Sequence, residues 1–264
     1  MARYPERIIC LTEETTETIY LLGEQDRIVG ISGFTVRPPE ARREKPKVSA
    51  FTSAKLDKIE ALKPDLVLGF SDLQADIAAD LVRRGIEVHV FNHRTVADIF
   101  RMMAMLGGML GVEAKTHALM AELEAGLDTL RAAAAKLPCH PRVYFEEWDE
   151  PQISGIAWVS ELVGLAGGVD IFPELAQESL AKHRIVQDPL EVPRRAPDII
   201  LGSWCGKKFR PRTVEARPGW GEVPAVRDGE LHEIKSSLIL QPGPAALTDG
   251  VNAIHSIIAD WARK

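Results

Sequence analysis

The sequence has no apolar run that approaches the roughly 20 residues that a membrane-spanning helix requires. Its three cysteines, Cys10, Cys139 and Cys205, fit neither a disulfide framework nor a zinc-site spacing. A basic excess is also missing, because the net charge is −6, and this argues against general binding to nucleic acids or anionic membranes. Segment 1–6 leads into a strand-like run without the apolar core of a signal peptide, so the chain as written is expected not to be exported. An upstream leader is the open alternative.

The bulk composition is that of an ordinary globular protein. Hydrophobic residues make up 45% of the 264 positions and charged residues 27%. A chain of this length is long enough for one large domain or two small ones with a substantial core.

Three segments of the first half return in the second half, in the same order. The matched pairs are 64–69 (PDLVLG) with 197–202 (PDIILG), 16–23 (TETIYLLG) with 160–167 (SELVGLAG), and 7–9 (RII) with 142–144 (RVY). Two similar α/β lobes would enclose a cleft, which is where small ligands bind. Two unrelated α/β halves with generic Pro-Asp strand entries are the alternative.

Strand-like apolar runs alternate with helical segments in both halves, a pattern typical of parallel sheets covered by helices. In the first half we expect strands at 7–11, 26–32, 65–70 and 86–91, helices at 17–22, 56–62, 76–84 and 96–110, and a loop at 35–47. In the second half we expect strands at 142–146, 199–201 and 231–234, and helices at 160–166, 189–192 and 245–261.

A segment without proline, 112–137, separates the halves. Its leucines and alanines recur three or four residues apart, which predicts one helix about 39 Å long at roughly 1.5 Å per residue. Such a helix would act as a strut between two lobes, and the expected domains are 1–111, 112–137 and 138–264. A surface helix within a single large domain is the alternative.

Several motifs resemble those of a known family. Segment 7–11 (RIICL) followed by Thr16 and Glu17, and segment 46–67 from PKV through KLDKI to LKPDLV, resemble the class III substrate-binding proteins. These are the receptors of ABC importers for cobalamin, ferric siderophores and haem, and the likeness is strongest to the periplasmic cobalamin binders. The resemblance implies two Rossmann-like lobes with parallel sheets, one long bridging helix, a ligand cleft between the lobes, and a periplasmic location.

The resemblance also implies ligand contacts. Phe51 and Phe70 match positions where the family places aromatic residues, and Phe34 stands where a tyrosine is usual. In the second half Trp158 follows Ser154 and Gly155, and Trp204 follows the predicted strand 199–201. Aromatic faces suit a large apolar macrocycle. Ligands in α/β folds lie beyond the carboxyl ends of strands, which favours these residues as a set over ordinary packing. The acidic run 146–150 is expected at the cleft rim, with Glu147 or Asp149 bonding ligand amides.

Family receptors dock on the importer's permease through one acidic residue on each lobe. Asp76 and Glu222 match these residues by position, and two solvated surface carboxylates are the alternative. The expected partners are therefore the permease subunits and a metal-chelate ligand, with the protein itself a monomer.

Other chemistry has weaker support in the sequence. The acidic run could serve acid–base catalysis, but no partner base or Gly-x-Ser-x-Gly motif accompanies it, so no enzyme activity and no cofactor are expected. Cys205 and His183 are weak candidates for an axial ligand to cobalt or iron. The basic loop 207–217 would suit ligand carboxylates or a phosphate. The preferred ligand is cobalamin or a related corrinoid; a ferric siderophore or haem, or a non-exported corrinoid-handling protein, are the alternatives.

Overall fold

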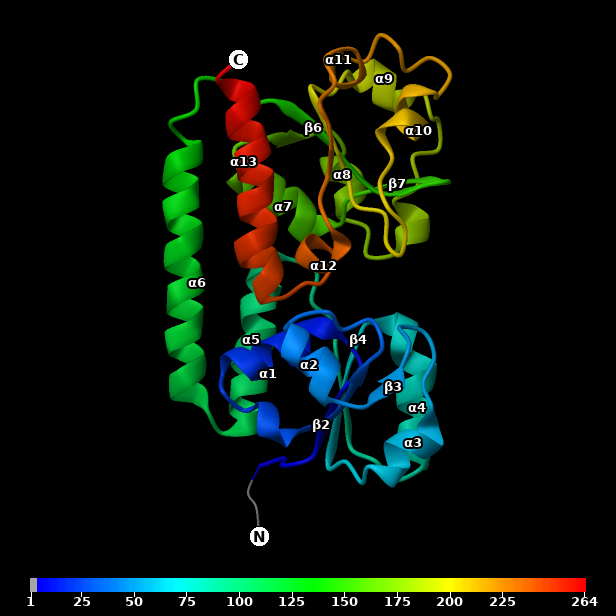
Figure 1. The fold of residues 1–264 in the computed structure, drawn as a ribbon, viewed down its shortest axis with the longest axis vertical. Coiled ribbons are helices and arrows are strands. Elements are labelled where there is room, and N and C mark those ends of the chain that lie inside the picture. The colour runs from blue at the N-terminus through cyan, green and yellow to red at the C-terminus, as the bar shows by residue number, and fades with distance from the viewer. Residues whose placement is uncertain (1–3) are drawn as a thin grey trace. The chain divides into compact units, whose positions relative to one another are not determined.

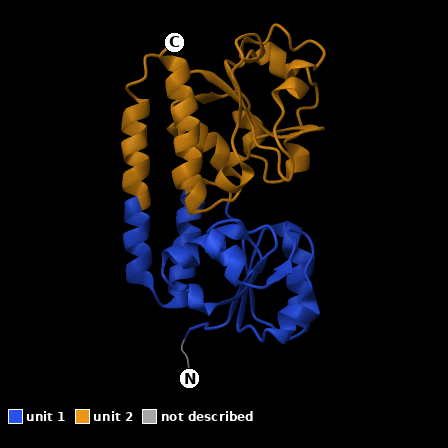
Figure 2. Cartoon of the chain, in the orientation of Figure 1, with its two compact units in different colours: residues 1–93, 97–122 blue, residues 94–96, 123–264 orange. Residues whose placement is uncertain are grey.

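The computed structural model describes residues 4–264. The chain forms two compact units (Figure 2): unit 1 comprises 1–93 and 97–122, and unit 2 comprises 94–96 and 123–264. Each unit has its own five-stranded sheet (Figure 1), so the predicted α/β class with one sheet per half is confirmed. Between residues 4 and 264, no helix is both long and apolar enough to cross a bilayer.

The sheet of unit 1 is parallel throughout, in the order β3-β2-β1-β4-β5. Ile8, Ile9 and Cys10 of the central strand β1 are all fully buried, because both faces of a parallel sheet are covered. The strands are β1 (Ile8–Cys10), β2 (Ile28–Ser32), β3 (Lys47–Ser49), β4 (Leu66–Phe70) and β5 (Val88–Phe91).

Helices α3 and α4 cover one face of this sheet (Figure 1) through a cluster that contains Ile59, Ile77 and Leu81 packed on Ile9 and Val67. The helices of the first half are α1 (Glu13–Leu21), α2 (Pro39–Glu44), α3 (Leu56–Ala61), α4 (Ala75–Arg83) and α5 (Val96–Leu110). Helix α1 begins four residues earlier than predicted, so Glu13 and Glu14 lie in its first turn. Acidic side chains at this place interact favourably with the helix dipole when they are ionised.

The prediction of a loop at 35–47 was wrong, because it contains helix α2. Pro39 stands at the start of this helix, where its fixed φ is already helical and its missing N–H is not needed. Glu40 lies in the first turn and Arg42 and Arg43 in the last, which matches the helix dipole. Proline therefore marked a helix start here.

The long helix α6 (Glu113–Ala134) lies inside the predicted segment 112–137. Leu123, Leu127, Leu130 and Ala134 are buried at three- to four-residue spacing, as the periodicity predicts. Its amino-terminal part belongs to unit 1 and its carboxyl-terminal part to unit 2. Its role as a strut, and the domain limits drawn around it, stay predictions.

The sheet of unit 2 has the order β10-β9-β6-β7, with β8 paired to β6. It is mixed, because β7 runs antiparallel to β6 in a hairpin that the sequence analysis did not predict. The acidic run 146–150 therefore lies largely within a strand, and only Glu150 follows it. The strands are β6 (Arg142–Asp149), β7 (Gln152–Ser154), β8 (Val169–Asp170), β9 (Ile199–Gly202) and β10 (Leu231–Glu233).

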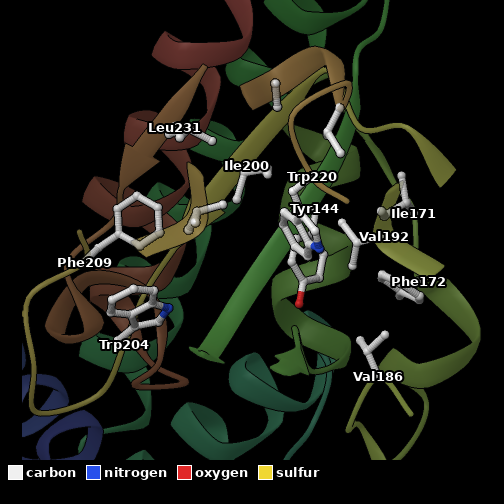
Figure 3. Packing of buried hydrophobic residues seen from close by; sticks show 13 residues of the cluster. Tyr144, Ile171, Phe172, Val186, Val192, Ile200, Trp204, Phe209, Trp220 and Leu231 are labelled. Carbon is white, nitrogen blue, oxygen red and sulfur yellow. The ribbon is translucent and has the colours of Figure 1, made fainter. Parts of the chain in front are cut away.

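The core of unit 2 is rich in aromatic side chains (Figure 3). Tyr144 meets Phe172 and Trp220 edge to face, with ring centroids 5.6 and 6.3 Å apart. The helices are α7 (Ala157–Leu165), α8 (Pro173–Ala176), α9 (Glu191–Arg195), α10 (Pro211–Glu215), α11 (Pro224–Arg227), α12 (Ser236–Ile239) and α13 (Val251–Ala262). The predicted terminal helix 245–261 opens with a π-helical turn at Ala246–Gly250 before α13.

The two repeated helices end alike. Gly23 lies just beyond α1 with φ +74°, and Gly167 lies just beyond α7 with φ +101°. A left-handed residue at this place lets the chain leave the helix with its last carbonyls satisfied, and glycine adopts it without strain. The repeated segments 16–23 and 160–167 thus share the way in which their helices end.

Candidate functional site

In unit 1 the three predicted phenylalanines follow or end strands of the same parallel sheet, with β1 between β2 and β4. Phe34 follows β2, Phe51 follows β3, and Phe70 is the last residue of β4. Phe34 is 63% exposed and Phe51 is half-buried, whereas Phe70 is only 7% exposed. The carboxyl edge of this sheet therefore offers ring surface through Phe34 and Phe51, while Phe70 packs edge to face on His93 at a centroid distance of 4.8 Å.

Gln74 joins two of these aromatic segments. Its side-chain oxygen accepts a hydrogen bond from the Phe70 N–H (2.9 Å), and its amide nitrogen donates to the Phe51 carbonyl (2.9 Å). Gln74 is 1% exposed, so both bonds are sheltered from water. The sequence analysis missed this residue, because nothing in a lone glutamine signals contacts to two strand ends.

The first turn of α1 brings two buried carboxyl groups to the same edge of the sheet. Glu13 and Glu14 are 3% and 1% exposed. Burial raises the pKa of each to about 7, because desolvation disfavours the charged form and outweighs the hydrogen bonds that favour it. These groups therefore change charge near neutral pH, which the sequence analysis did not predict.

In unit 2 the end of β6 carries three acidic side chains, each paired with a cation. Glu146 is fully buried and accepts two hydrogen bonds from Arg217, at 2.6 and 2.9 Å. The indole N–H of Trp204 donates to the same carboxylate at 3.0 Å. Glu146 therefore fixes both an arginine and a tryptophan, and bidentate pairs of this kind hold their geometry well.

Glu147 lies where the pairing of β6 with β7 is irregular, between Glu146 and Trp148. Its carboxylate accepts two hydrogen bonds from Arg184, at 2.6 and 3.2 Å. Arg184 is 2% exposed and also donates to the Ser154 carbonyl on β7 at 2.5 Å. The hairpin is thus fastened by a buried guanidinium.

The third pair involves Asp149 and Lys207, which form an ion pair. The Lys207 ammonium also lies 4.2 Å from the ring centroid of Trp148 and 5.1 Å from that of Trp204. A cation at these distances is attracted to the ring faces. Two members of the predicted basic loop, Lys207 and Arg217, are therefore engaged by carboxylates of β6.

The two predicted tryptophans of unit 2 are packing residues in this structure. Trp158 and Trp204 are each 4% exposed. Trp158 lies in α7, and its indole N–H donates to the Ile239 carbonyl at 2.8 Å. Trp204 packs on Phe209 at a centroid distance of 4.9 Å (Figure 3). Neither ring presents a broad open face.

The remaining predicted residues lie at the surface. Asp76 is exposed in the first turn of α4, and Glu222 is exposed between α10 and α11. Cys205 lies at an exposed position, where desolvation of its sulfur raises the pKa of the thiol. His183 forms an ion pair with Glu178 at 3.4 Å. Across residues 4–264, no three His, Cys, Asp or Glu side chains are grouped so that they could hold a metal ion.

A model of the family described as periplasmic binding protein matches residues 8–238. The chain belongs to this family. Its members are substrate-binding proteins of ABC transporters and are not enzymes, so the predicted class of binding protein is confirmed.

Two relatives in bacteria match most of the chain and differ in their descriptions. An uncharacterized ABC transporter substrate-binding lipoprotein of Bacillus subtilis is 24% identical over 96% of this chain and 80% of its own length. A vitamin B12-binding protein of Vibrio parahaemolyticus is 28% identical over 94% of this chain and 88% of its own length. Both likenesses extend over more than nine tenths of this chain.

The fold is also that of solved family structures. A protein of Staphylococcus epidermidis, described as possibly iron-binding and periplasmic, has a TM-score of 0.82 at 18% identity, with 97% of this chain and 99% of that chain covered. At this identity the likeness concerns the fold. The predicted bilobed α/β class of these binding proteins is therefore confirmed.

Proposed function

We propose that this protein captures cobalamin or a related corrinoid outside the cytoplasm and delivers it to an ABC importer. The family supports the role of a substrate-binding protein, and the B12-binding relative from Vibrio supports the ligand class. The lipoprotein relative from Bacillus supports an extracytoplasmic location and a transporter as partner.

The observation that carries the choice of ligand is the pairing of charges at the end of β6. Arg184 and Arg217 are each held by two hydrogen bonds to a carboxylate, and Lys207 is paired with Asp149. A ligand with several carboxylates, such as haem or many siderophores, gains most from unpaired arginines. Paired cations favour a ligand recognised by apolar contact and by neutral amide groups, as a corrinoid is.

The aromatic surface of unit 1 supplies the apolar contact. Phe34 and Phe51 stand at adjacent strand ends with exposed or half-exposed rings. Phenyl rings bring large contact area at a small cost in rotamer entropy, which suits the face of a macrocycle. Phe70 supports this surface of unit 1 from within. In unit 2, Glu147 and Asp149 are the proposed acceptors for ligand amides, and Trp158 and Trp204 pack in the interior of that unit.

The test is a calorimetric titration with cyanocobalamin, haemin and a ferric siderophore in parallel. We expect one-to-one binding of cyanocobalamin that is tighter than that of the other two. The double variant Phe34→Ala/Phe51→Ala should weaken this binding at least about tenfold, because two ring contacts are lost. Leu21→Ala serves as the control, since Leu21 is a 52% exposed apolar residue at the carboxyl-terminal end of α1 and is not one of the proposed ligand contacts.

Preferential binding of haemin or the siderophore would overturn the ligand class and leave the family role intact. Equal weakening by the double variant and by Leu21→Ala would overturn the aromatic site, even if cyanocobalamin binds.

A further inference from the structure

The segment that carries Phe34 is held in place by several hydrogen bonds. The Phe34 N–H donates to the Ser32 hydroxyl at 3.2 Å. Arg42 of α2 donates to the carbonyls of Gly33 (2.8 Å) and Thr35 (3.1 Å). Thr35 is fully buried directly beside the exposed ring of Phe34. The backbone on either side of the ring is therefore fixed, while the ring itself reaches into solvent.

A buried carboxylate completes this arrangement. Oε2 of Glu13 accepts hydrogen bonds from the backbone N–H groups of Val36 and Arg37, the latter at 3.2 Å. Oε1 of Glu13 is buried and has no hydrogen-bond partner. One oxygen of Glu13 thus accepts both hydrogen bonds from the segment that follows Phe34, and the other is desolvated without a partner.

We propose that Glu13 is the positioning residue of the Phe34 segment, and that its ionised carboxylate holds this segment in the conformation that contacts ligand. The proposal rests on the proposed function, in which Phe34 touches the ligand. It adds a dependence on a group that touches neither the ligand nor the ring.

The physical reason is the strength of a charge-assisted hydrogen bond. A carboxylate accepts from backbone N–H groups about twice as strongly as a neutral acceptor does. When Glu13 takes up a proton, the proton goes to the unpartnered Oε1, and Oε2 remains as a neutral and therefore weaker acceptor for the N–H groups of Val36 and Arg37. The segment is then held mainly by Arg42.

Burial and the charged groups around Glu13 set the pH at which its carboxyl group changes charge. Burial opposes the ionisation of Glu13 most strongly, and Glu17 on the same helix opposes it as well, while Glu13 in turn opposes the ionisation of Glu14. Arg37 on the held segment favours the ionised form of Glu13 and pairs with Glu17 at 2.9 Å. Arg42 reaches the segment from α2. With burial added, the pKa of Glu13 is raised to about 7, so the hold weakens as the pH falls through neutrality.

The first measurement needs no ligand. Hydrogen exchange of the Val36 and Arg37 amides, expressed as protection relative to the unstructured chain, compares the wild type with Glu13→Gln between about pH 6 and pH 8. We expect wild-type protection to fall on acidification and the variant to show the low value at both pH values. Glu40→Gln is the matched control, because Glu40 is an exposed carboxylate of α2 paired with Arg43.

The second measurement is cyanocobalamin affinity over the same pH range. We expect wild-type affinity to fall about threefold to tenfold on acidification, as one charge-assisted contact weakens. Glu13→Gln should show the acidic value throughout, whereas Glu40→Gln should follow the wild type. The Gln side chain keeps the size and one acceptor oxygen, so folding is retained.

The outcomes separate the two proposals. Equal protection of Val36 and Arg37 in the wild type and Glu13→Gln overturns the positioning role, whatever the ligand. If Glu13→Gln loses protection of these amides but the wild-type affinity for cyanocobalamin does not change with pH, the link from Glu13 to the ligand is overturned. Failure of cyanocobalamin to bind at any pH overturns the proposed ligand alone, and the exchange result then decides the positioning role.

Discussion

Asp65 and Asp198 make the same contacts in the two units. The Asp65 carboxylate accepts from the Arg7 N–H, and the Asp65 N–H donates to the Arg7 carbonyl, both at 2.9 Å. The Asp198 carboxylate and N–H make the matching pair with Arg142, both at 2.8 Å. The repeated Pro-Asp therefore ties the start of a strand to the start of its parallel neighbour in each sheet.

We expect Asp65→Ala and Asp198→Ala each to lower the free energy of unfolding by about 1 kcal/mol, because an N–H loses a charged acceptor but stays reachable by water. Urea unfolding measures the change. Asp260→Ala is the control, since Asp260 is 70% exposed and forms only an i,i+3 pair with Arg263. A loss no larger than that of the control would show that the repeated contact is not stabilising.

Removing one partner of the buried pair of Glu146 and Arg217 should lower the free energy of unfolding more than replacing both partners by apolar residues does. Glu146→Leu or Arg217→Met alone leaves an uncompensated buried charge, and we expect a loss of about 3 kcal/mol for each. The double variant Glu146→Leu/Arg217→Met should lose clearly less than the sum, which a double-mutant cycle in urea detects. Simple additivity of the two losses would contradict a coupled pair.

Gln74 offers a test of how the aromatic segments of unit 1 are held. Gln74→Leu removes the partners of the Phe70 N–H and the Phe51 carbonyl, and we expect a loss of about 1–3 kcal/mol from the unfolding free energy. Ligand affinity should fall as well, because Phe51 is no longer fixed. Gln177→Leu is the control, as Gln177 is an exposed residue with a single 3.5 Å contact. Unchanged stability and affinity would remove Gln74 from the site.

Glu14 should make the protein less stable as the pH rises. Its pKa is raised from 4.5 to about 7 by burial, so the folded state binds more protons than the unfolded state between these values. The favourable contribution is complete below about pH 4.5 and is lost as the pH rises through about 7, by at most about 3 kcal/mol. Urea unfolding from about pH 4 to pH 9 should show this decline in the wild type and a smaller one in Glu14→Gln. Parallel curves for the two proteins would refute the assignment.

The docking role of Asp76 and Glu222 is testable apart from ligand binding. Both carboxylates are exposed, one in each unit, so charge reversal should spare the fold. We expect Asp76→Arg/Glu222→Arg to bind ligand with unchanged affinity and to abolish uptake by cells that carry the cognate importer, because docking charges set orientation and encounter rate. Retained uptake would remove the docking role. Asp80→Arg, which alters another exposed carboxylate of α4, serves as the control.

Much of the fold could be predicted from local pattern. The apolar runs of β1, β4 and β9 and the spacing of leucines in α6 are short-range signals, and the elements appeared where these signals lay. The prediction of a loop at 35–47 was wrong because proline is common both in loops and at the first position of a helix, and Pro39 opens α2. The hairpin of β6 and β7 was missed because three residues, Gln152–Ser154, carry too little pattern to predict a strand.

The candidate site divides in the same way. Exposed Phe34 follows β2, in agreement with the predicted strand 26–32, whereas half-exposed Phe51 follows β3, a strand that was not predicted. Trp158 and Trp204 also follow strands, but their burial depends on Ile239 and Glu146, which are 81 and 58 residues away. An aromatic residue at a strand end therefore indicates a site only where the rest of the fold leaves its ring uncovered.

The sequence by itself determined the order of strands and helices, the internal repeat and the family, because periodicity and short motifs depend on neighbours along the chain. Only the tertiary structure decided which charges remain available. Glu146 and Glu147 are adjacent in sequence, yet Glu146 pairs with Arg217 and Glu147 pairs with Arg184. Each arginine arrives from a distant segment, so its pairing is set by packing and by the low polarity of the interior.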